Sequence, residues 1–169
     1  MKGIFTIVLF LFFLKSCDEN KNTDFIELSS GFNMNPAEPR FGIIYKPDNN
    51  IYYCTEIMKN KNSTGKYKYF ISESRIDFVE YKTLMNENFR KNYIPPFKPI
   101  VDATIFQIKY QFNNEVDKVR FYPEQLNEKQ LMIFEMMKNL KDNGKFKEID
   151  SITFSKDLLQ YKLPEPPKL

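Results

Sequence analysis

The chain has 169 residues, of which 25 are basic, 22 are acidic, two are cysteine and none is histidine. The lack of histidine excludes Ser-His-Asp and Cys-His nucleophilic systems, the commonest general base and most zinc sites. No cysteine cluster or glycine-rich phosphate loop replaces them, so the sequence predicts no catalytic residue, no cofactor and no metal site. A formal net charge of +3 without a long basic run argues against a nucleic-acid partner.

The first 16 residues have the layout of a secretory leader. Lys2 supplies a short positive region, and residues 4–14 are apolar apart from Thr6. This run is too short to span a bilayer, which takes about 20 apolar residues in a helix. We therefore expect residues 1–16 to be a signal peptide that is removed. Because Lys2 and Lys15 leave with it, the net charge of the remaining chain falls to about +1.

The tetrapeptide Leu14-Lys15-Ser16-Cys17 resembles a lipobox, the site at which bacteria attach a lipid to a cysteine before cleavage. Lys15 departs from the pattern, where an uncharged residue is usual. The resemblance implies a lipoprotein of the bacterial cell envelope, anchored to the inner or outer membrane through acyl chains on Cys17. Two or more such chains are enough for stable anchoring. The alternative is an ordinary secreted protein that is cleaved nearby.

Composition divides the rest of the chain into three parts. Residues 17–24 are polar and lack apolar periodicity, which predicts a flexible tether. Residues 25–161 suit a single α+β domain, large enough to bury a core without disulfides. Residues 162–169 contain Pro164, Pro166 and Pro167 and predict a stiff, exposed tail.

Alternating apolar residues and turn residues predict an antiparallel sheet of about six or seven strands. Four strands in a meander are expected first, at 25–28, 41–45, 51–59 and 66–71, with turns at 47–50 and 60–65. A second hairpin is expected at 103–110 and 116–122 around Asn113-Asn114. A last strand-like segment contains Ile149, Ile152 and Phe154, and one or two helical turns should follow it in 155–161.

Two amphipathic helices are predicted to pack on one face of this sheet. The first is expected at Glu73–Asn88, with Ser72 as its N-cap. Its apolar stripe consists of Phe78, Tyr81, Met85 and Phe89, widened by Ile76 and Val79. The second is expected to begin after Asn127, which forms a capping pair with Gln130, and to stop at Gly144. Its apolar stripe consists of Leu131, Phe134, Met137 and Leu140, and Met132, Ile133 and Met136 predict that it is covered on more than one side.

The order of these features resembles a family of small domains of unknown function that is common in bacterial lipoproteins. The residues that carry the resemblance are Ser30-Gly31, Asp48-Asn49, Tyr52-Tyr53, Gly65 and Tyr67, Ile71-Ser72, and Pro99 with Asp102-Ala103. That family often has cysteines after its first strand and an Asp-Gly turn. Here Asn33, Met34 and Asn49 stand in that region, so any chemistry of those cysteines is absent. The resemblance implies the fold and no activity.

The aromatic residues are the one unusual positive feature, at 16% of the chain and all Phe or Tyr. Tyr52 beside Tyr53, and Tyr67 alternating with Tyr69, are a candidate binding surface for a sugar or a peptide. The alternative is cross-strand packing of the rings. Arg40, beside a loop rich in Gly and Pro, is a candidate anion contact, or else a lone exposed arginine. Cys54 lies in a strand-like run and is interpreted as a buried small hydrophobe.

These features predict a membrane-anchored, non-catalytic binding module with a protein partner. One alternative is an immunity protein that neutralises a toxin delivered into the periplasm. Such a protein commonly presents a strongly charged face, which a net charge near +1 does not supply. Another alternative is a hydrolase that uses paired carboxylates, with Asp77 and Glu80 or Asp48 and Glu56 as the candidate pairs. Scattered charge on a solvated surface explains these carboxylates better.

Overall fold

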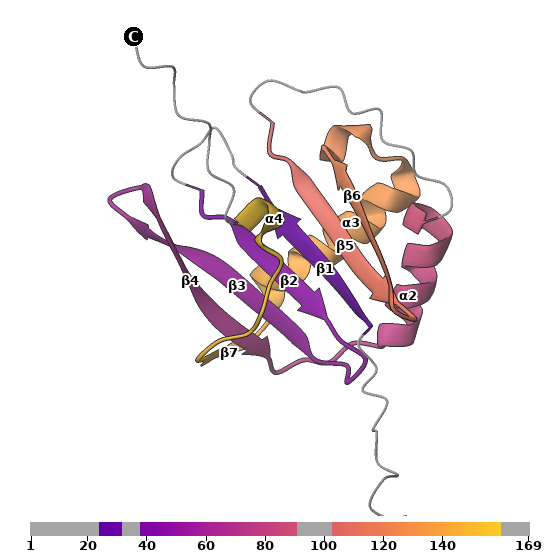
Figure 1. Cartoon of the computed structure of the whole chain (residues 1–169), viewed down its shortest axis with the longest axis horizontal. Coiled ribbons are helices and arrows are strands. Elements are labelled where there is room, and N and C mark those ends of the chain that lie inside the picture. Colours follow the sequence, from indigo (N-terminus) through magenta and orange to yellow (C-terminus); the bar gives the residue numbers. More distant parts are fainter. Residues whose placement is uncertain (1–23, 32–37, 91–102, 160–169) are drawn as a thin grey trace, which may run out of the picture.

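The computed structural model describes residues 24–31, 38–90 and 103–159. In Figure 1, seven strands form one antiparallel sheet in the order β6-β5-β1-β2-β3-β4-β7. The strands are β1 (Phe25–Ser30), β2 (Phe41–Tyr45), β3 (Ile51–Lys59), β4 (Asn62–Ser72), β5 (Phe106–Phe112), β6 (Glu115–Phe121) and β7 (Phe146–Ile149). The predicted α+β class with an antiparallel sheet of six or seven strands is confirmed.

The first four strands form the predicted meander, because each pairs with the next along the chain. The prediction that β4 starts at residue 66 was wrong, since it starts at Asn62. Asn60 and Lys61 have φ values of 52° and 62°, the pair of positive values that a two-residue type I′ turn needs. The residues expected to form a loop therefore pair with β3 across this tight turn, and Gly65 has a positive φ within the strand.

The second hairpin is also confirmed, with β5 lying beside β1 and β6 at the edge of the sheet. Asn113 and Asn114 connect its strands and have φ values of 52° and 68°. Asparagine tolerates this left-handed conformation better than most residues. The turn residues thus fix the register, which places Phe106, Ile108 and Tyr110 on the buried face.

Helix α2 (Phe78–Met85) begins later than predicted and continues into one π-helical turn, Asn86–Arg90. The prediction of Ser72 as the N-cap was wrong, because Ser72 ends β4, where it pairs with Phe146 of β7. The cap is Asp77, whose carboxylate accepts hydrogen bonds from the backbone of Val79 and Glu80. Val79 is 70% exposed and does not belong to the buried stripe.

Helix α3 (Glu128–Asn143) has the predicted ends. Asn127 and Gln130 form a reciprocal capping box, and the helix is capped at Gly144. The prediction of cover on more than one side was wrong, because Met132 is 59% exposed and Leu131 is also exposed. The helix packs through one stripe, in which Ile133, Phe134 and Met137 are buried.

The main core lies between the sheet and these two helices. Phe134 of α3 is fully buried and meets Phe106 and Phe121 edge-on, with ring centroids 4.8 and 5.5 Å apart. Tyr45 of β2 stacks on Tyr81 of α2 at 4.9 Å. Such aromatic pairs add to the stabilisation from burial alone, so contacts between rings hold the two helices on this face of the sheet.

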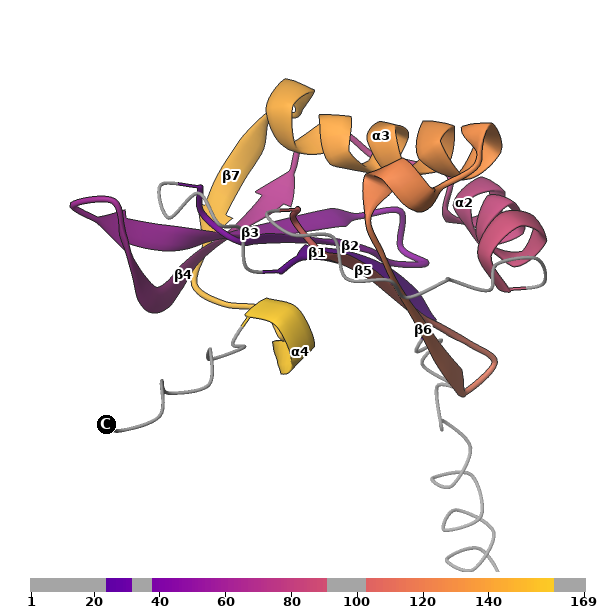
Figure 2. The ribbon, with the colours of Figure 1, turned by 90° about the horizontal axis from the view of Figure 1, so that it is seen from above.

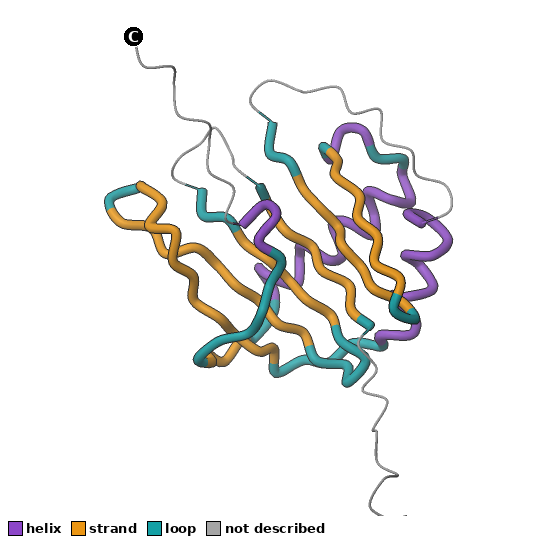
Figure 3. The backbone as a smooth tube through the Cα atoms, viewed as in Figure 1, coloured by secondary structure: helices purple, strands orange, loops and turns teal. Residues whose placement is uncertain are grey.

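Within the described part of the chain, one segment covers the opposite face of the sheet, residues 150–159, which we call the strap. Figure 2 shows the short helix α4 (Lys156–Leu159) on the side of the sheet away from α2 and α3. Figure 3 shows the rest of the strap crossing the strands as a loop. The prediction of a strand through Ile152 and Phe154 was wrong, because β7 ends at Ile149. We call the two sides of the sheet the helical face and the strap face.

The N-terminal boundary differs by one residue from the predicted one. Asp24 was expected to end the flexible tether but is buried. Its carboxylate accepts hydrogen bonds from Lys82 at 2.7 Å and from the backbone of Asn113 at 2.9 Å. The domain therefore includes Asp24. Cys17, the leader and the proline-rich tail lie outside the described residues.

Candidate functional site

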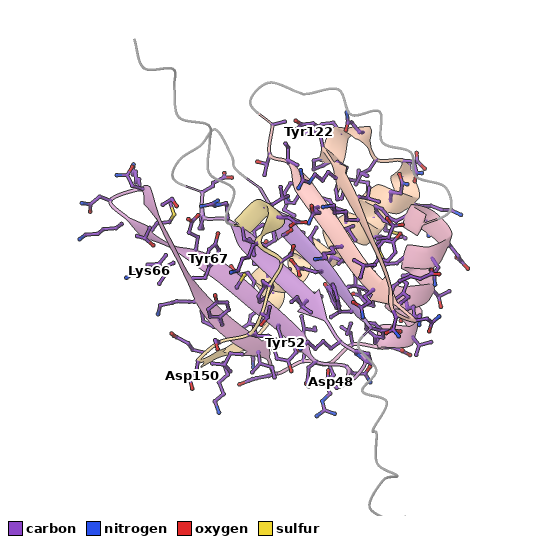
Figure 4. The ribbon with its side chains drawn as sticks, in the orientation of Figure 1. Asp48, Tyr52, Lys66, Tyr67, Tyr122 and Asp150 are labelled. Atoms are coloured by element: carbon purple, nitrogen blue, oxygen red, sulfur yellow. The ribbon has the colours of Figure 1, made fainter. Side chains whose placement is uncertain are left out.

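Strand alternation distributes the five predicted surface residues over both faces of the sheet. Tyr53 packs against the main core with Phe70 and Phe146. Tyr52, Tyr67 and Tyr69 point the other way and pack around the strap, and Figure 4 labels Tyr52 and Tyr67 beside it. Tyr52 and Tyr53 therefore do not form one surface, because neighbours on a strand face opposite sides.

Arg40 is neither exposed nor alone. Its guanidinium makes two bonds to the Glu56 carboxylate, at 2.8 and 3.0 Å, and the Glu56 side chain is only 2% exposed. Ser63 also donates a hydrogen bond to Glu56. Burial by itself would raise the pKa of Glu56, but the hydrogen bonds from Arg40 and Ser63 outweigh it and hold this pKa below its ordinary value. Arg40 thus neutralises a buried carboxylate of this same chain.

An aromatic socket on the strap face holds the side chain of Phe154. A Cβ atom on Gly42 would lie 2.7 and 2.9 Å from two carbons of the Phe154 ring, so the ring rests directly on the backbone of β2. Cys54 and Ile44 are buried beside it, and the Tyr69 ring lies 6.2 Å away between centroids. Cys54 is a free cysteine with no exposed surface, which confirms its interpretation as a buried small hydrophobe, and this burial raises the pKa of its thiol.

Next to this socket a buried carboxylate binds the backbone of the strap. Glu27 of β1 is 3% exposed, and its two oxygens accept from the Ser155 N–H at 3.1 and 3.0 Å. Burial raises the pKa of Glu27 to about 7, against the opposing effects of the Ser155 hydrogen bond and the charge of Lys109. The Glu27 carboxylate therefore binds the strap through a backbone N–H, a contact that does not depend on the side chain at position 155.

A basic row on β5 and β6 lies on the same face, opposite helix α4. Lys118 donates to the Asp157 carboxylate at 3.2 Å, and Lys109 stands opposite it in the β5–β6 register. The bond from Lys118 lowers the pKa of Asp157 most, and the charge of Lys109 adds to this effect. Arg120 donates to the side-chain oxygen of the buried Gln107 at 2.9 Å.

The strap does not fill the face that it covers. A cavity of about 410 Å³ on one flank is lined by Phe25, Ile44, Lys46, Lys109 and Phe154, among others. A cavity of about 220 Å³ on the other flank is lined by Tyr67, Tyr69 and the strap. Ser29 Oγ, a buried polar atom of this face, has no hydrogen-bond partner among the described residues. A well-packed core rarely leaves such atoms unpaired.

A cavity of about 500 Å³ lies on the helical face, at the end of the sheet where β1 ends and β2 begins. It is lined by the rings of Phe41, Tyr53 and Phe106 and by Lys138 and Lys141. Lys141 lies 5.1 Å from the centroid of the Phe41 ring. Of the five predicted surface residues, only Tyr53 lines this cavity.

Three of the four carboxylates in the predicted pairs, those of Asp77, Asp48 and Glu56, make structural contacts. Asp77 caps α2, and Asp48 accepts from the backbone of Asn50 in the β2–β3 turn at 3.0 Å. Glu56 is held by Arg40, so it is not paired with Asp48. Among the described residues, no group of three or more Cys, Asp or Glu side chains could hold a metal ion.

Sequence reasoning missed Glu27, Gly42, Lys109, Phe154 and Asp157. A signal existed for Gly42, because a lone glycine inside a strand indicates close approach of another group to the backbone. Glu27 lies between Ile26 and Leu28, as a polar residue does in a strand that alternates between core and solvent. That pattern predicts an exposed Glu27 and not a buried one. Nothing local links either residue to the strap, which lies more than 100 residues later.

A scan against protein-family models finds no match for this sequence, and a search of curated proteins finds none either. The resemblance to a lipoprotein family of unknown function therefore stays a prediction. Within the described ranges, no helix is long and apolar enough to cross a membrane.

Proposed function

We propose that the protein is a membrane-anchored, non-catalytic binding module of the bacterial cell envelope, which is lipidated on Cys17 and binds a protein partner through the strap face. The observation that carries this proposal is the unequal cover of the two sides of the sheet. Two helices cover the helical face, which has a cavity at one end, whereas among the described residues one segment crosses the strap face and leaves a cavity on each flank. Three of the predicted aromatic residues, Tyr52, Tyr67 and Tyr69, lie on that face.

The geometry is compatible with an anchor at Cys17. Asp24 is fixed at the start of β1, and the seven peptide steps between Cys17 and Asp24 can span at most about 25 Å. A lipid on Cys17 would therefore keep the domain close to the bilayer surface. A partner would be bound within the envelope without any catalytic group on this chain.

The anchor is tested by replacing the lipidated residue. Cys17→Ser should release the protein from membranes or block its processing, and a fatty-acid analogue should label the wild type only. A mature protein that begins at a residue other than Cys17 would overturn this part of the proposal.

The binding face is tested by site-specific cross-linking. A photoreactive phenylalanine analogue at Tyr52 or Tyr69 keeps an aromatic ring on the strap face. The matched control places the same group at Val79, which is 70% exposed on α2. We expect a discrete cross-linked product from Tyr52 or Tyr69 and none from Val79. The reverse pattern would place the partner on the helical face, and a secreted toxin in the product would identify an immunity protein.

A further inference from the structure

The strap is bound to the sheet in the way a peptide ligand is bound. Residues 151–155 pair with none of the described strands, and they reach the sheet through side chains and one backbone N–H. Phe154 fills the socket on Gly42, the Ser155 N–H binds Glu27, and Asp157 binds Lys118. These three contacts recognise an aromatic ring, a backbone N–H and an acidic side chain three residues after the ring, in the helical turn of α4.

The fit of the strap to this face is incomplete. Cavities of about 410 and 220 Å³ remain on its flanks. Ser29 Oγ stays unpaired among the described residues although it is buried. Gln107 and Ser29 are register partners on neighbouring strands and therefore belong to one patch. A longer or better matched segment could occupy the cavities and bond to Ser29 Oγ.

The positive charge of Lys109 and Lys118 on the strap face favours a bound segment with an acidic residue. Lys118 and Lys109 stand opposite each other on β6 and β5, and like charges at such positions repel. An acidic side chain between them relieves that repulsion, as Asp157 does. A basic or neutral residue at the same position would leave Lys118 without its carboxylate, whereas Lys109 would still stand beside Glu27.

We infer that the strap is an internal substitute for an external ligand, and that the strap face binds a segment of a separate partner protein in which an aromatic residue precedes a helical turn with an acidic residue three positions after the ring. This inference rests on the proposed function and names the ligand class of the same face. The strap must detach for the partner to bind, so the apparent affinity depends on the fraction of molecules in which the face is open.

The test uses the full chain and a fluorescent peptide with the sequence of residues 151–159, and it measures binding by anisotropy. Phe154→Ala removes the ring of the strap and leaves the socket intact. We expect this variant to bind the peptide at least about tenfold more tightly than the wild type does, because its open fraction rises by that factor. A peptide with alanine in place of its phenylalanine should not bind, and a peptide with lysine in place of its aspartate should bind weakly.

Two further variants keep the test decisive. Adding Gly42→Ala to Phe154→Ala fills the socket and should abolish binding of the peptide. Asp157→Lys opens the strap by repulsion from Lys109 and Lys118, and it serves as the host if Phe154→Ala fails to fold. Equal binding of the phenylalanine and alanine peptides, or no gain over the wild type in a folded open variant, would overturn the inference.

Other outcomes separate this inference from the proposed function. A concentration-dependent dimer of the wild type that Gly42→Ala abolishes would show that a second copy of the chain is the occupant, and would contradict a separate partner. A cross-linked partner at Tyr52 or Tyr69 together with failure of the peptide test would refute the ligand class and leave the binding face in place. Failure of both tests would reject the proposed function as well.

Discussion

The two faces of this sheet are built from the same strands but hold different chemistry. The helical face buries stacked and edge-on rings, such as Phe106, Phe121 and Phe134, beneath two helices. The strap face buries Glu27 and Gln107, and in the described ranges one short segment covers it. Burying polar groups costs free energy unless they form hydrogen bonds. The strap face therefore stabilises the fold less than an apolar face of the same area would.

This difference divides stability and recognition between the two faces of the sheet. The helical face supplies the stability, because its interlocked apolar residues are removed from water. The strap face can then carry groups that are unfavourable when buried but useful for recognition. The predictions below test this division, starting with the largest expected effect.

Truncating a ring of the helical face should cost the most stability. Phe134 is fully buried between two other rings, so Phe134→Ala should lower the free energy of unfolding by about 3–5 kcal/mol. Urea denaturation followed by circular dichroism measures this loss. The matched variant is Phe154→Ala on the strap face, which should cost less because the strap can detach without unfolding the sheet. Equal losses in the two variants would contradict the division between the faces.

Removing the buried charge of the strap face should increase stability at alkaline pH. The pKa of Glu27 is raised to about 7 in the folded state, so the folded protein binds a proton that the unfolded chain releases near pH 4.5. The free energy of unfolding therefore falls as the pH rises between these values, and the full penalty is present above pH 7. Glu27→Gln should remove a penalty of up to about 3 kcal/mol at pH 8 and change little near pH 4.

Denaturation at both pH values measures the effect of Glu27→Gln. Glu148→Gln is the control, because the pair of Glu148 with Lys68 is exposed and such pairs contribute little. A Glu27→Gln variant that loses stability equally at both pH values would show that the Ser155 bond outweighs the cost of burying the charge.

Filling the socket should have the smallest effect on global stability. The new Cβ of Gly42→Ala would meet the Phe154 ring and lie 3.1 Å from Cys54 Sγ, so the ring must move. Overpacking of this kind costs about 1–3 kcal/mol, and a strap that detaches should keep the loss at the low end. The change should instead appear as faster amide exchange in residues 153–157, with α3 unaffected. Faster exchange in α3 would show that the two faces are coupled.

Local sequence signals were sufficient for much of the fold. The stripe through Phe78 and Met85, the capping box of Asn127 with Gln130, and the Asn113-Asn114 turn all act within a few residues, so their effects could be predicted from the sequence. The start of α2 could not be, because Ser72 and Asp77 are both good caps. Pairing of Ser72 with Phe146, 74 residues later, decides between them.

The candidate site was predicted less well, and for a related reason. Tyr52, Tyr67 and Tyr69 were identified from their type and alternation, but Arg40 could not be matched to Glu56 without the register of β2 on β3. Phe154 continued an apolar alternation and was therefore predicted to be in a strand. Its real partner is a glycine of β2, which has no side chain to indicate the contact.

Native-state amide hydrogen exchange of the wild type tests the division of the sheet most directly. We predict that the amides of Phe154 and Ser155 exchange through a local opening that needs much less free energy than global unfolding and is insensitive to low denaturant concentrations. The amides of Phe134 and Met137 in α3 should exchange only when the whole domain unfolds. Protection of the strap amides equal to that of α3 would show that the strap is a permanent part of the core, and would contradict our account of the strap face as a binding surface.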